Sequence, residues 1–373
     1  MTTYPQPVFF CALLFALPLL MGALAASAEE EWHNPAEFDL EGKGWADTEA
    51  FFDRLPTHAK GKAPEDVWGL SKDSAGMAVR FQTDSREIAV HWIVTGAELA
   101  LPHMPSTGVS GVDLYRRAAD GSWRFVQNGR PGTTPENRAS FAVGGDPGQM
   151  REYLLYLPLY NGVRSLEIGI TPGAHIQKAT PRPAARSRPI VFYGTSITQG
   201  GCASRPGMAY TAILGRRLDQ PVINLGFSGS GRMEPEMAAL LAELDPQLFV
   251  IDCLANMAAL PEDEIARRVT GLAQTVRRAR PNTPILFVAQ SSIRPERHPT
   301  PASRVQEQAV KRLQAEGVTG LYLLDGAHLL GADEEATVDG SHPSDLGMMR
   351  MAEAMAPALR AVLAKASPQA SGR

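Results

Sequence analysis

The sequence predicts an antiparallel β-sandwich followed by a three-layer α/β domain with a five-stranded parallel sheet. In the N-terminal half, short apolar runs are separated by turn residues, and helical periodicity is largely absent. In the C-terminal half, unbroken apolar runs alternate with amphipathic patterns, which is typical of a parallel sheet covered by helices on both faces. A segment rich in proline, alanine and arginine separates the two rhythms.

The composition and charge of the sequence limit the classes of function to consider. The chain has 373 residues, of which 44% are hydrophobic and 20% are charged, and its net charge is −4. These values are ordinary for a globular protein of about two domains. Because the sequence has no basic cluster with interleaved aromatic residues, we expect neither a nucleic acid nor an anionic membrane surface as a partner.

Residues 1–28 read as a secretory signal peptide. The apolar stretch VFFCALLFALPLLMGALAA is followed by Ala26-Ser27-Ala28, an A-x-A pattern that predicts cleavage after Ala28. We therefore expect an exported protein, periplasmic or extracellular, with no stable membrane insertion after cleavage. The leading MTTYPQP has no Lys or Arg, so an uncleaved anchor is the alternative, since the stretch is about the ~20 residues that span a bilayer.

Residues 33–178 are assigned to the β-sandwich domain. The strand-like runs are MAVRFQTD, EIAVHWIV, GVDLYRRAADGSWRFVQ, EYLLYLPLY and SLEIGIT, and Asp120-Gly121 in the third predicts a tight hairpin. The one helical pattern here is DTEAFFDRL, residues 47–55. Such short alternating runs indicate two packed antiparallel sheets.

Residues 179–188 form the predicted linker, and residues 189–366 form the α/β domain. Its five strand-like runs are PIVFYG, PVINLGF, LFVIDCLA, PILFVAQ and LYLLDG, with helical patterns such as EPEMAALLAEL, DEIARRVTGLAQTVRRA and SRVQEQAVKRLQAEG between them. In open parallel sheets, ligands bind at the carboxyl ends of the strands. Turns that follow these runs are therefore the places to look for a site.

The first such turn, GTSITQGG at residues 194–201, is a glycine-rich link between a strand and a helix. No Lys follows at P-loop spacing, and the dinucleotide spacing G-x-G-x-x-G is absent. The ordinary nucleophile elbow G-x-S-x-G needs glycine where Thr198 stands. What remains is Ser196 on a sharp turn, and taken alone such a serine is most often a helix cap.

Partners for a serine nucleophile occur further along the chain. Asp339 and His342 stand in VDGSH, directly before a C-terminal helix expected to start near residue 343, and supply a carboxylate and a base. A second pair with the same spacing, Asp325 and His328, lies in an apolar run and is the less favoured alternative. We expect oxyanion donors after the second and third strands, in the turn at Gly229 and in the side chain of Asn256. These residues are suited to acyl transfer through an activated serine.

The ordered set in GTSIT, LGFSGSG, CLANM and DGSH resembles the SGNH hydrolases, also called GDSL-type esterases, over residues 189–363. The resemblance implies a flavodoxin-like domain and ester chemistry without a metal or cofactor. It implies Ser196 as nucleophile, Asp339 and His342 as its triad partners, and the Ser196 N–H, Gly229 and Asn256 as the oxyanion hole. Thr195 stands where the namesake motif has Asp. The run SGVDLY, residues 110–115, is similar to the G-x-D-L-Y motif of a subgroup with an N-terminal β-sandwich.

We expect a small-molecule or carbohydrate ester as the substrate, and Arg205 and His103 are candidates for binding it. Removal of acetyl groups from carbohydrate suits an exported enzyme with a sandwich domain. An acyltransferase using the same acyl-enzyme, and a glycan-binding protein with a vestigial hydrolase domain, are the alternatives. The oligomeric state and a disulfide between Cys202 and Cys253 are left open.

Overall fold

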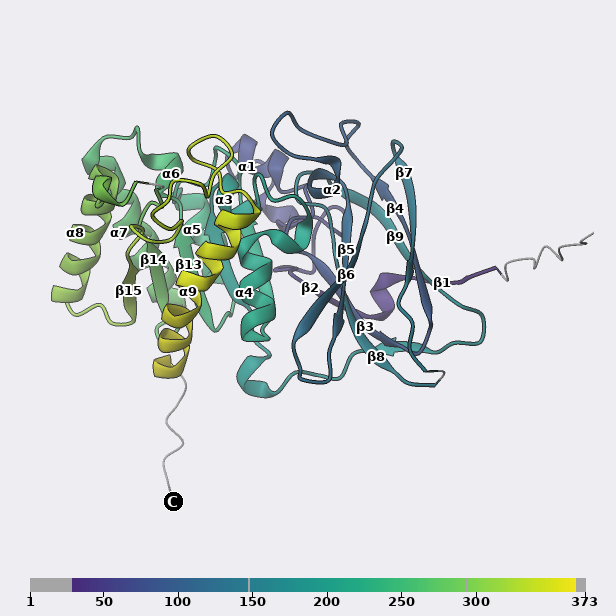
Figure 1. Cartoon of the computed structure of the whole chain (residues 1–373). Coiled ribbons are helices and arrows are strands. Elements are labelled where there is room, and N and C mark those ends of the chain that lie inside the picture. The colour runs from purple at the N-terminus through teal and green to yellow at the C-terminus, as the bar shows by residue number, and fades with distance from the viewer. Residues whose placement is uncertain (1–28, 147, 293, 367–373) are drawn as a thin grey trace, which may run out of the picture.

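The computed structural model describes residues 29–146, 148–292 and 294–366. A β-sandwich and an α/β part lie side by side in it (Figure 1). The predicted signal peptide, residues 1–28, lies outside the described residues. Among the described residues, no helix has both the length and the apolar character needed to cross a membrane.

The sandwich consists of two antiparallel sheets, as predicted. One has the order β1-β9-β4-β7, and the other has the order β10-β3-β8-β5-β6, with β2 paired to β3. The strands are β1 Glu31–His33, β2 Asp39–Glu41, β3 Ala78–Thr83, β4 Glu87–Val94, β5 Val112–Arg117, β6 Trp123–Gly129, β7 Glu136–Ala142, β8 Arg151–Tyr156, β9 Val163–Ile170 and β10 Ile176–Lys178. Asp120-Gly121 turns β5 into β6 as expected, and Gly121 has a φ of 79°.

The second part holds the predicted five-stranded parallel sheet, in the order β12-β11-β13-β14-β15. The strands are β11 Ile190–Gly194, β12 Val222–Gly226, β13 Leu248–Asp252, β14 Ile285–Val288 and β15 Leu321–Leu324. The helices are α3 Ser196–Gln199, α4 Tyr210–Leu218, α5 Pro235–Glu243, α6 Leu254–Met257, α7 Glu262–Ala279, α8 Pro301–Ala315 and α9 Asp345–Ala366. Two further short helices, α1 Glu65–Leu70 and α2 Ser106–Val109, lie in the N-terminal half.

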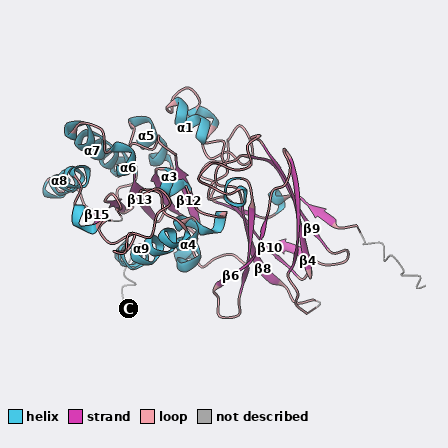
Figure 2. Cartoon of the chain, turned by 45° about the horizontal axis from the view of Figure 1, so that its top comes forward, coloured by secondary structure: helices cyan, strands magenta, loops and turns pink. Residues whose placement is uncertain are grey.

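Helices cover both faces of the parallel sheet (Figure 2), and alternate residues of each strand face opposite sides. On β11, Val191 and Tyr193 pack in one core with α5, α7 and α8. Ile190 and Phe192 pack in the other core with α4 and α9. The unbroken apolar runs of the sequence follow from this two-sided burial.

One sheet of the sandwich is also buried on both faces, which joins the two parts of the molecule. On β8, Tyr153 and Leu155 point into the sandwich core, whereas Leu154 and Tyr156 pack in the same core as α4. This accounts for the run EYLLYLPLY, which lacks the polar alternation of a strand with one face in water.

Residues 44–70 precede most of the sandwich strands, yet most of their buried apolar side chains pack on the parallel sheet, with Phe52 in the sandwich core as the exception. Leu55 and Val67 belong to the core formed with α5 and α7. Arg54 is 1% exposed, and its guanidinium donates to the carbonyl oxygens of Asn224 and Gly226 at 3.2 and 2.7 Å. The expected helix at residues 47–55 is wrong, because turns occupy this stretch and α1 begins only at Glu65.

Candidate active site

The turn after β11 presents Ser196 at the first position of α3. Thr195 caps this helix, because its Oγ1 accepts a hydrogen bond from the Ile197 N–H at 3.2 Å. Threonine and aspartate side chains are both suited to accept such a bond at a helix N-terminus. Gly231 packs closely against the same turn, and a Cβ there would lie 1.9 Å from the Gly194 carbonyl oxygen. Ser196 is 8% exposed.

His342 and Asp339 meet Ser196 from the loop before α9. The Ser196 Oγ lies 2.8 Å from His342 Nε2, and His342 Nδ1 lies 2.7 Å from Asp339 Oδ2. The loop is closed by the Val338 N–H, which donates to the His342 carbonyl oxygen at 2.9 Å, and by the Ser344 N–H, which donates to the Ala336 carbonyl oxygen at the same distance. A carboxylate, an imidazole and a hydroxyl in this chain of contacts form the geometry of a serine triad.

Asp339 is held in its ionised form. Partial burial acts to raise its pKa, but hydrogen bonds from the His342 and Ser341 N–H groups and from the His342 ring hold the pKa at about 2. The carboxylate therefore carries its charge throughout the neutral range. It can fix the imidazole with its second nitrogen toward the serine and stabilise an imidazolium.

The predicted oxyanion residues lie on neighbouring turns of the same sheet edge. Gly229 follows β12 with a φ of 68°, a left-handed conformation that glycine adopts without cost. Asn256 lies in α6 after β13, and its Nδ2 is 3.4 Å from the Phe227 carbonyl oxygen and 3.3 Å from that of Gly231. The structure thus brings Asn256 onto the loop that contains Gly229. Their role as donors stays a prediction.

Of the two candidates for substrate binding, His103 lies at the site. Its ring centroid is 6.2 Å from that of His342, so a sandwich loop borders the triad. Arg205 is instead held by the G-x-D-L-Y motif, with its Nη1 2.8 Å from Asp113 Oδ2 and 2.6 Å from the Tyr115 hydroxyl. These contacts tie the loop after the nucleophile to the sandwich, and a substrate role for Arg205 stays a prediction.

Sequence reasoning missed a buried network behind the nucleophile. The fully buried Gln199 donates from Nε2 to Asp73 Oδ2 at 2.9 Å and to the Leu159 carbonyl oxygen at 3.1 Å. Its Oε1 accepts the N–H of Ser228, next to Gly229, at 3.0 Å. Burial raises the pKa of Asp73 to about 6, although Arg54 and Gln199 act to lower it. The partners are 126 residues apart, and no local pattern marks either one.

A second contact from the sandwich reaches the nucleophile itself. The Tyr160 hydroxyl donates to the Ser196 carbonyl oxygen at 3.2 Å. Tyr160 follows β8, so the strand run recognised in the sequence ends at the active site. The network and Tyr160 show that residues from the N-terminal half position the turn after β11.

Cys202 and Cys253 are both buried free thiols and form no disulfide with each other. Burial raises the pKa of the Cys202 thiol to about 11, so it stays protonated and unreactive at neutral pH. Among the residues that the structure describes, no group of three or more His, Cys, Asp or Glu side chains is arranged to hold a metal ion.

Comparisons with known proteins agree with this two-part fold. A model of the GDSL-like lipase/acylhydrolase family matches residues 187–360, and a model of the G-x-D-L-Y N-terminal domain of SGNH-type esterases matches residues 30–176. A crystal structure described as a GDSL-like lipase from Bacteroides ovatus is 36% identical, covers 90% of this chain and 98% of its own, and has a TM-score of 0.80. No curated protein matches the chain.

More distant solved structures share the fold. Salicylyl-acyltransferase SsfX3 from a tetracycline biosynthetic pathway is 20% identical, with 89% of this chain and 97% of its own covered and a TM-score of 0.74. An acetyl xylan esterase from Butyrivibrio proteoclasticus is 12% identical, with 90% and 99% covered and a TM-score of 0.59. Both similarities extend over the sandwich and the α/β part together.

Proposed function

The chain belongs to the GDSL-like lipase/acylhydrolase family and is a hydrolase of ester bonds, and from this premise we propose that it is an exported serine esterase acting through an acyl-enzyme on Ser196. The observation that carries the proposal is the 2.8 Å contact between Ser196 Oγ and His342 Nε2, with Asp339 behind the imidazole. Export is supported by the signal-peptide pattern of residues 1–28.

In the proposed reaction, Ser196 Oγ attacks the ester carbonyl carbon while His342 Nε2 takes the hydroxyl proton. The tetrahedral intermediate then collapses, the bond to the alcohol oxygen breaks, and the imidazolium returns its proton to the leaving alcohol. Water attacks the acyl-enzyme in the same way and releases the carboxylic acid. Asp339 stays ionised throughout and stabilises the imidazolium.

Negative charge on the carbonyl oxygen is met by the proposed oxyanion hole. Its donors are the N–H groups of Ser196 and Gly229 and the Nδ2 amide of Asn256. The Ser196 N–H lies in the first turn of α3, where a helix leaves its amides without internal partners. The loop of Gly229 is fixed by the Gln199 contact at Ser228. Donors fixed before the reaction stabilise a developing charge without a reorganisation cost.

The proposed substrates are acetyl esters of carbohydrates. Support comes from fold neighbours that are carbohydrate esterases, among them the acetyl xylan esterase, and from the sandwich loop that places His103 beside His342. Transfer of the acyl group to an acceptor alcohol is the second candidate, favoured by the TM-score of 0.74 to the salicylyl-acyltransferase. A vestigial hydrolase domain serving only glycan binding is disfavoured by the connected Ser–His–Asp geometry.

The test is a panel of nitrophenyl esters and acetylated sugars, run on the wild type and on Ser196→Ala. We expect Ser196→Ala to abolish turnover and labelling by a fluorophosphonate, because both need the serine oxygen. His342→Ala should lose activity to a similar extent, and His328→Ala, the matched control from the second Asp-x-x-His pair, should retain it. Full activity of Ser196→Ala would refute the proposal. Adding a sugar acceptor and measuring acylated sugar against free acid separates transfer from hydrolysis.

A further inference from the structure

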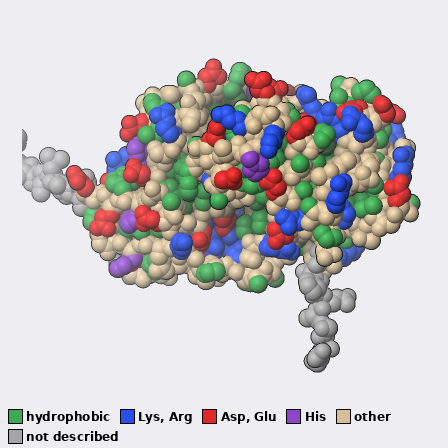
Figure 3. Space-filling model, turned by 180° about the vertical axis from the view of Figure 1, so that it is seen from behind, with side chains coloured by type: hydrophobic (Ala, Val, Ile, Leu, Met, Phe, Trp, Pro, Cys, Tyr) green, Lys and Arg blue, Asp and Glu red, His purple; other side chains and the backbone are tan. Residues whose placement is uncertain are grey.

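A groove of about 730 Å³ lies between the β5–β6 hairpin and α4, and the catalytic residues Ser196, Asp339 and His342 are not among those that line it. Its lining contains two aspartates, Asp120 and Asp219, and six arginines, Arg117, Arg124, Arg186, Arg205, Arg216 and Arg217. The whole chain has a net charge of −4, so this excess of positive charge is local. Viewed from behind, the molecule shows Lys and Arg interspersed with Asp and Glu over the entire face (Figure 3).

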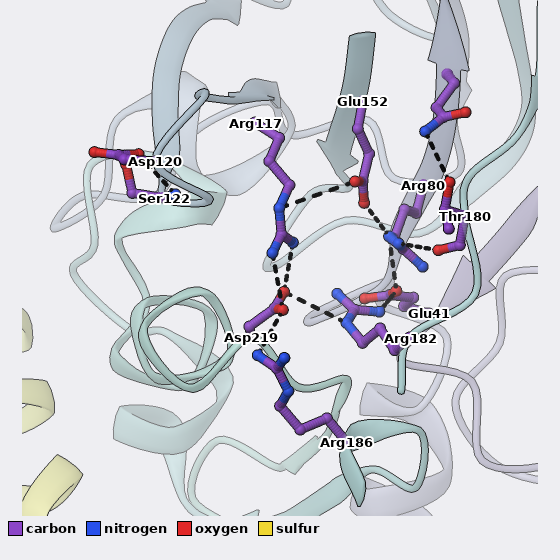
Figure 4. A network of polar contacts seen from close by, with 11 residues as sticks. Glu41, Arg80, Arg117, Asp120, Ser122, Glu152, Thr180, Arg182, Arg186 and Asp219 are labelled. Atoms are coloured by element: carbon purple, nitrogen blue, oxygen red, sulfur yellow. Dashed lines mark hydrogen bonds and ion pairs between the residues drawn. The ribbon is translucent and has the colours of Figure 1, made fainter. Parts of the chain in front are cut away.

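The carboxylates near this groove are already engaged. The Asp219 carboxylate accepts hydrogen bonds from Arg117 Nη1 at 2.6 Å and from Arg117 Nη2 at 2.9 Å. It also accepts one from Arg186 Nη1 at 2.9 Å (Figure 4). Although partial burial opposes it, these guanidinium groups lower the pKa of Asp219 below its usual value. Glu41 is likewise engaged by Arg182 and Arg80. The other lining arginines have carboxylate partners too: Arg205 pairs with Asp113, Arg217 with Glu353 and Arg124 with Asp120.

Arg216 is the arginine without such a partner. Its Nη2 donates to the Gly207 carbonyl oxygen at 2.7 Å, and its guanidinium carbon lies 4.0 Å from the centroid of the Tyr115 ring. Among the ion pairs of the described residues, none involves this side chain. A guanidinium that has lost part of its hydration without gaining a carboxylate favours an anionic ligand.

Arg216 and Trp123 also line a smaller cavity of about 20 Å³, which therefore adjoins the groove. Three buried donors of this cavity's lining, Arg216 Nη1, Trp123 Nε1 and Arg182 Nε, have no hydrogen-bond acceptor among the described residues. Arg182 Nε lies 3.7 Å from Asp219 Oδ1 and is therefore paired in charge, and Glu41, which also lines the cavity, is engaged by Arg182. Arg216 Nη1 and Trp123 Nε1 can only donate, and a ligand acceptor is favoured there because a buried donor left unpaired costs about 1–3 kcal/mol.

We propose that the groove and its inner cavity bind a carboxylate-bearing ligand, with one carboxylate oxygen entering the inner cavity and accepting from Arg216 Nη1 and Trp123 Nε1. The inner cavity has room for about one water-sized group, so the second carboxylate oxygen stays in the outer groove. The outer groove has the volume of a small-molecule site and receives the remainder of the ligand. This inference rests on the groove alone and does not depend on the proposed function.

The carboxylate can belong to a free short-chain acid or to an acidic sugar. Titration calorimetry of the full chain with acetate, glucuronate, glucose, inorganic phosphate and chloride distinguishes these sources. We expect saturable binding of acetate or glucuronate, with the tighter of the two identifying the source, and no binding of glucose. Phosphate or chloride binding as tightly as the carboxylates would overturn the proposal and mark the site as one for an adventitious ion only.

Two variants test the assigned donors. Trp123→Phe keeps a ring but removes the N–H, and Arg216→Gln removes the charge, so each should weaken carboxylate binding at least tenfold. Arg124→Gln is the matched control, because Arg124 lines the same groove but is exposed and pairs with Asp120, and its affinity should change less than threefold. Unchanged affinity in Trp123→Phe, or no carboxylate binding by the wild type at millimolar concentrations, would overturn the proposal. Melting temperatures of the variants identify any that fail to fold.

Discussion

Replacing Gln199 by leucine tests whether the buried network behind the nucleophile positions the oxyanion loop. The substitution keeps the side-chain volume roughly constant and removes the contacts to Asp73, the Leu159 carbonyl oxygen and the Ser228 N–H. Gly229 directly follows Ser228, so the proposed donor N–H loses the contact that fixes its loop.

The expected magnitude follows from the donor that is displaced. Removing one oxyanion donor lowers kcat by about 10²–10³-fold in a serine hydrolase. A displaced Gly229 amide should therefore lower kcat by about 10²-fold, with KM changed by less than about threefold because the donor acts on the transition state. Stability should also fall by about 1–3 kcal/mol, since Asp73 loses a buried hydrogen bond.

Steady-state kinetics on a nitrophenyl ester, with unfolding in urea alongside, checks both effects. Gln306→Leu is the matched control, because Gln306 is also fully buried and donates to the Val288 carbonyl oxygen at 3.0 Å. It should lose comparable stability with little change in kcat. A folded Gln199→Leu enzyme with wild-type kcat would refute the positioning role.

Other perturbations give separate readouts. Asp339→Asn should lower kcat by about 10³-fold with unchanged folding, because the amide no longer selects the tautomer of His342; equal rates would contradict the triad. Burial raises the pKa of Asp252 to about 6 although the Tyr210 hydroxyl opposes this. Its stabilising contribution is therefore complete below about pH 4 and is lost as the pH rises through 6. The melting temperature of Asp252→Asn minus that of the wild type should thus be larger at pH 7 than at pH 4, and a constant difference would contradict it. Gly229→Ala should reduce stability by about 1–2 kcal/mol through the left-handed φ, and Gly229→Asn by less; equal melting temperatures of the two would argue against backbone strain there.

The sequence predicted those features that are set by local patterns. The apolar runs marked strands of all three sheets but not the strands β1, β2, β7 and β10. The turn at Ser196 and the pair Asp339–His342 were identified because each is a short segment at a strand or helix end. The contacts of Gln199 were not predictable, because period and spacing along the chain do not tell which distant residue will face it. Arg205 shows the same limit, since its partner Asp113 is 92 residues away.

The placement of residues 44–70 illustrates a further limit. Apolar periodicity predicts that a segment is buried, but it does not predict which of two sheets will bury it. The boundary predicted at residues 179–188 follows a change in the sequence pattern. Residues 44–70 come before this boundary in the sequence, but they cover the parallel sheet that comes after it. The boundary itself stays a prediction, drawn from composition.

The packing of residues 44–70 has a consequence for the order in which the parts of the protein fold. Arg54 reaches carbonyl oxygens 170 and 172 residues further along the chain. During synthesis the segment leaves the ribosome well before the strand that receives it, so Leu55 and Val67 lack the core of the parallel sheet until β12 has been made, whereas Phe52 packs in the sandwich core. Contacts of such long sequence separation form slowly. Most of residues 44–70 therefore reach their final packing only after β12 has formed, and a chaperone that keeps them from aggregating should raise the yield of active enzyme.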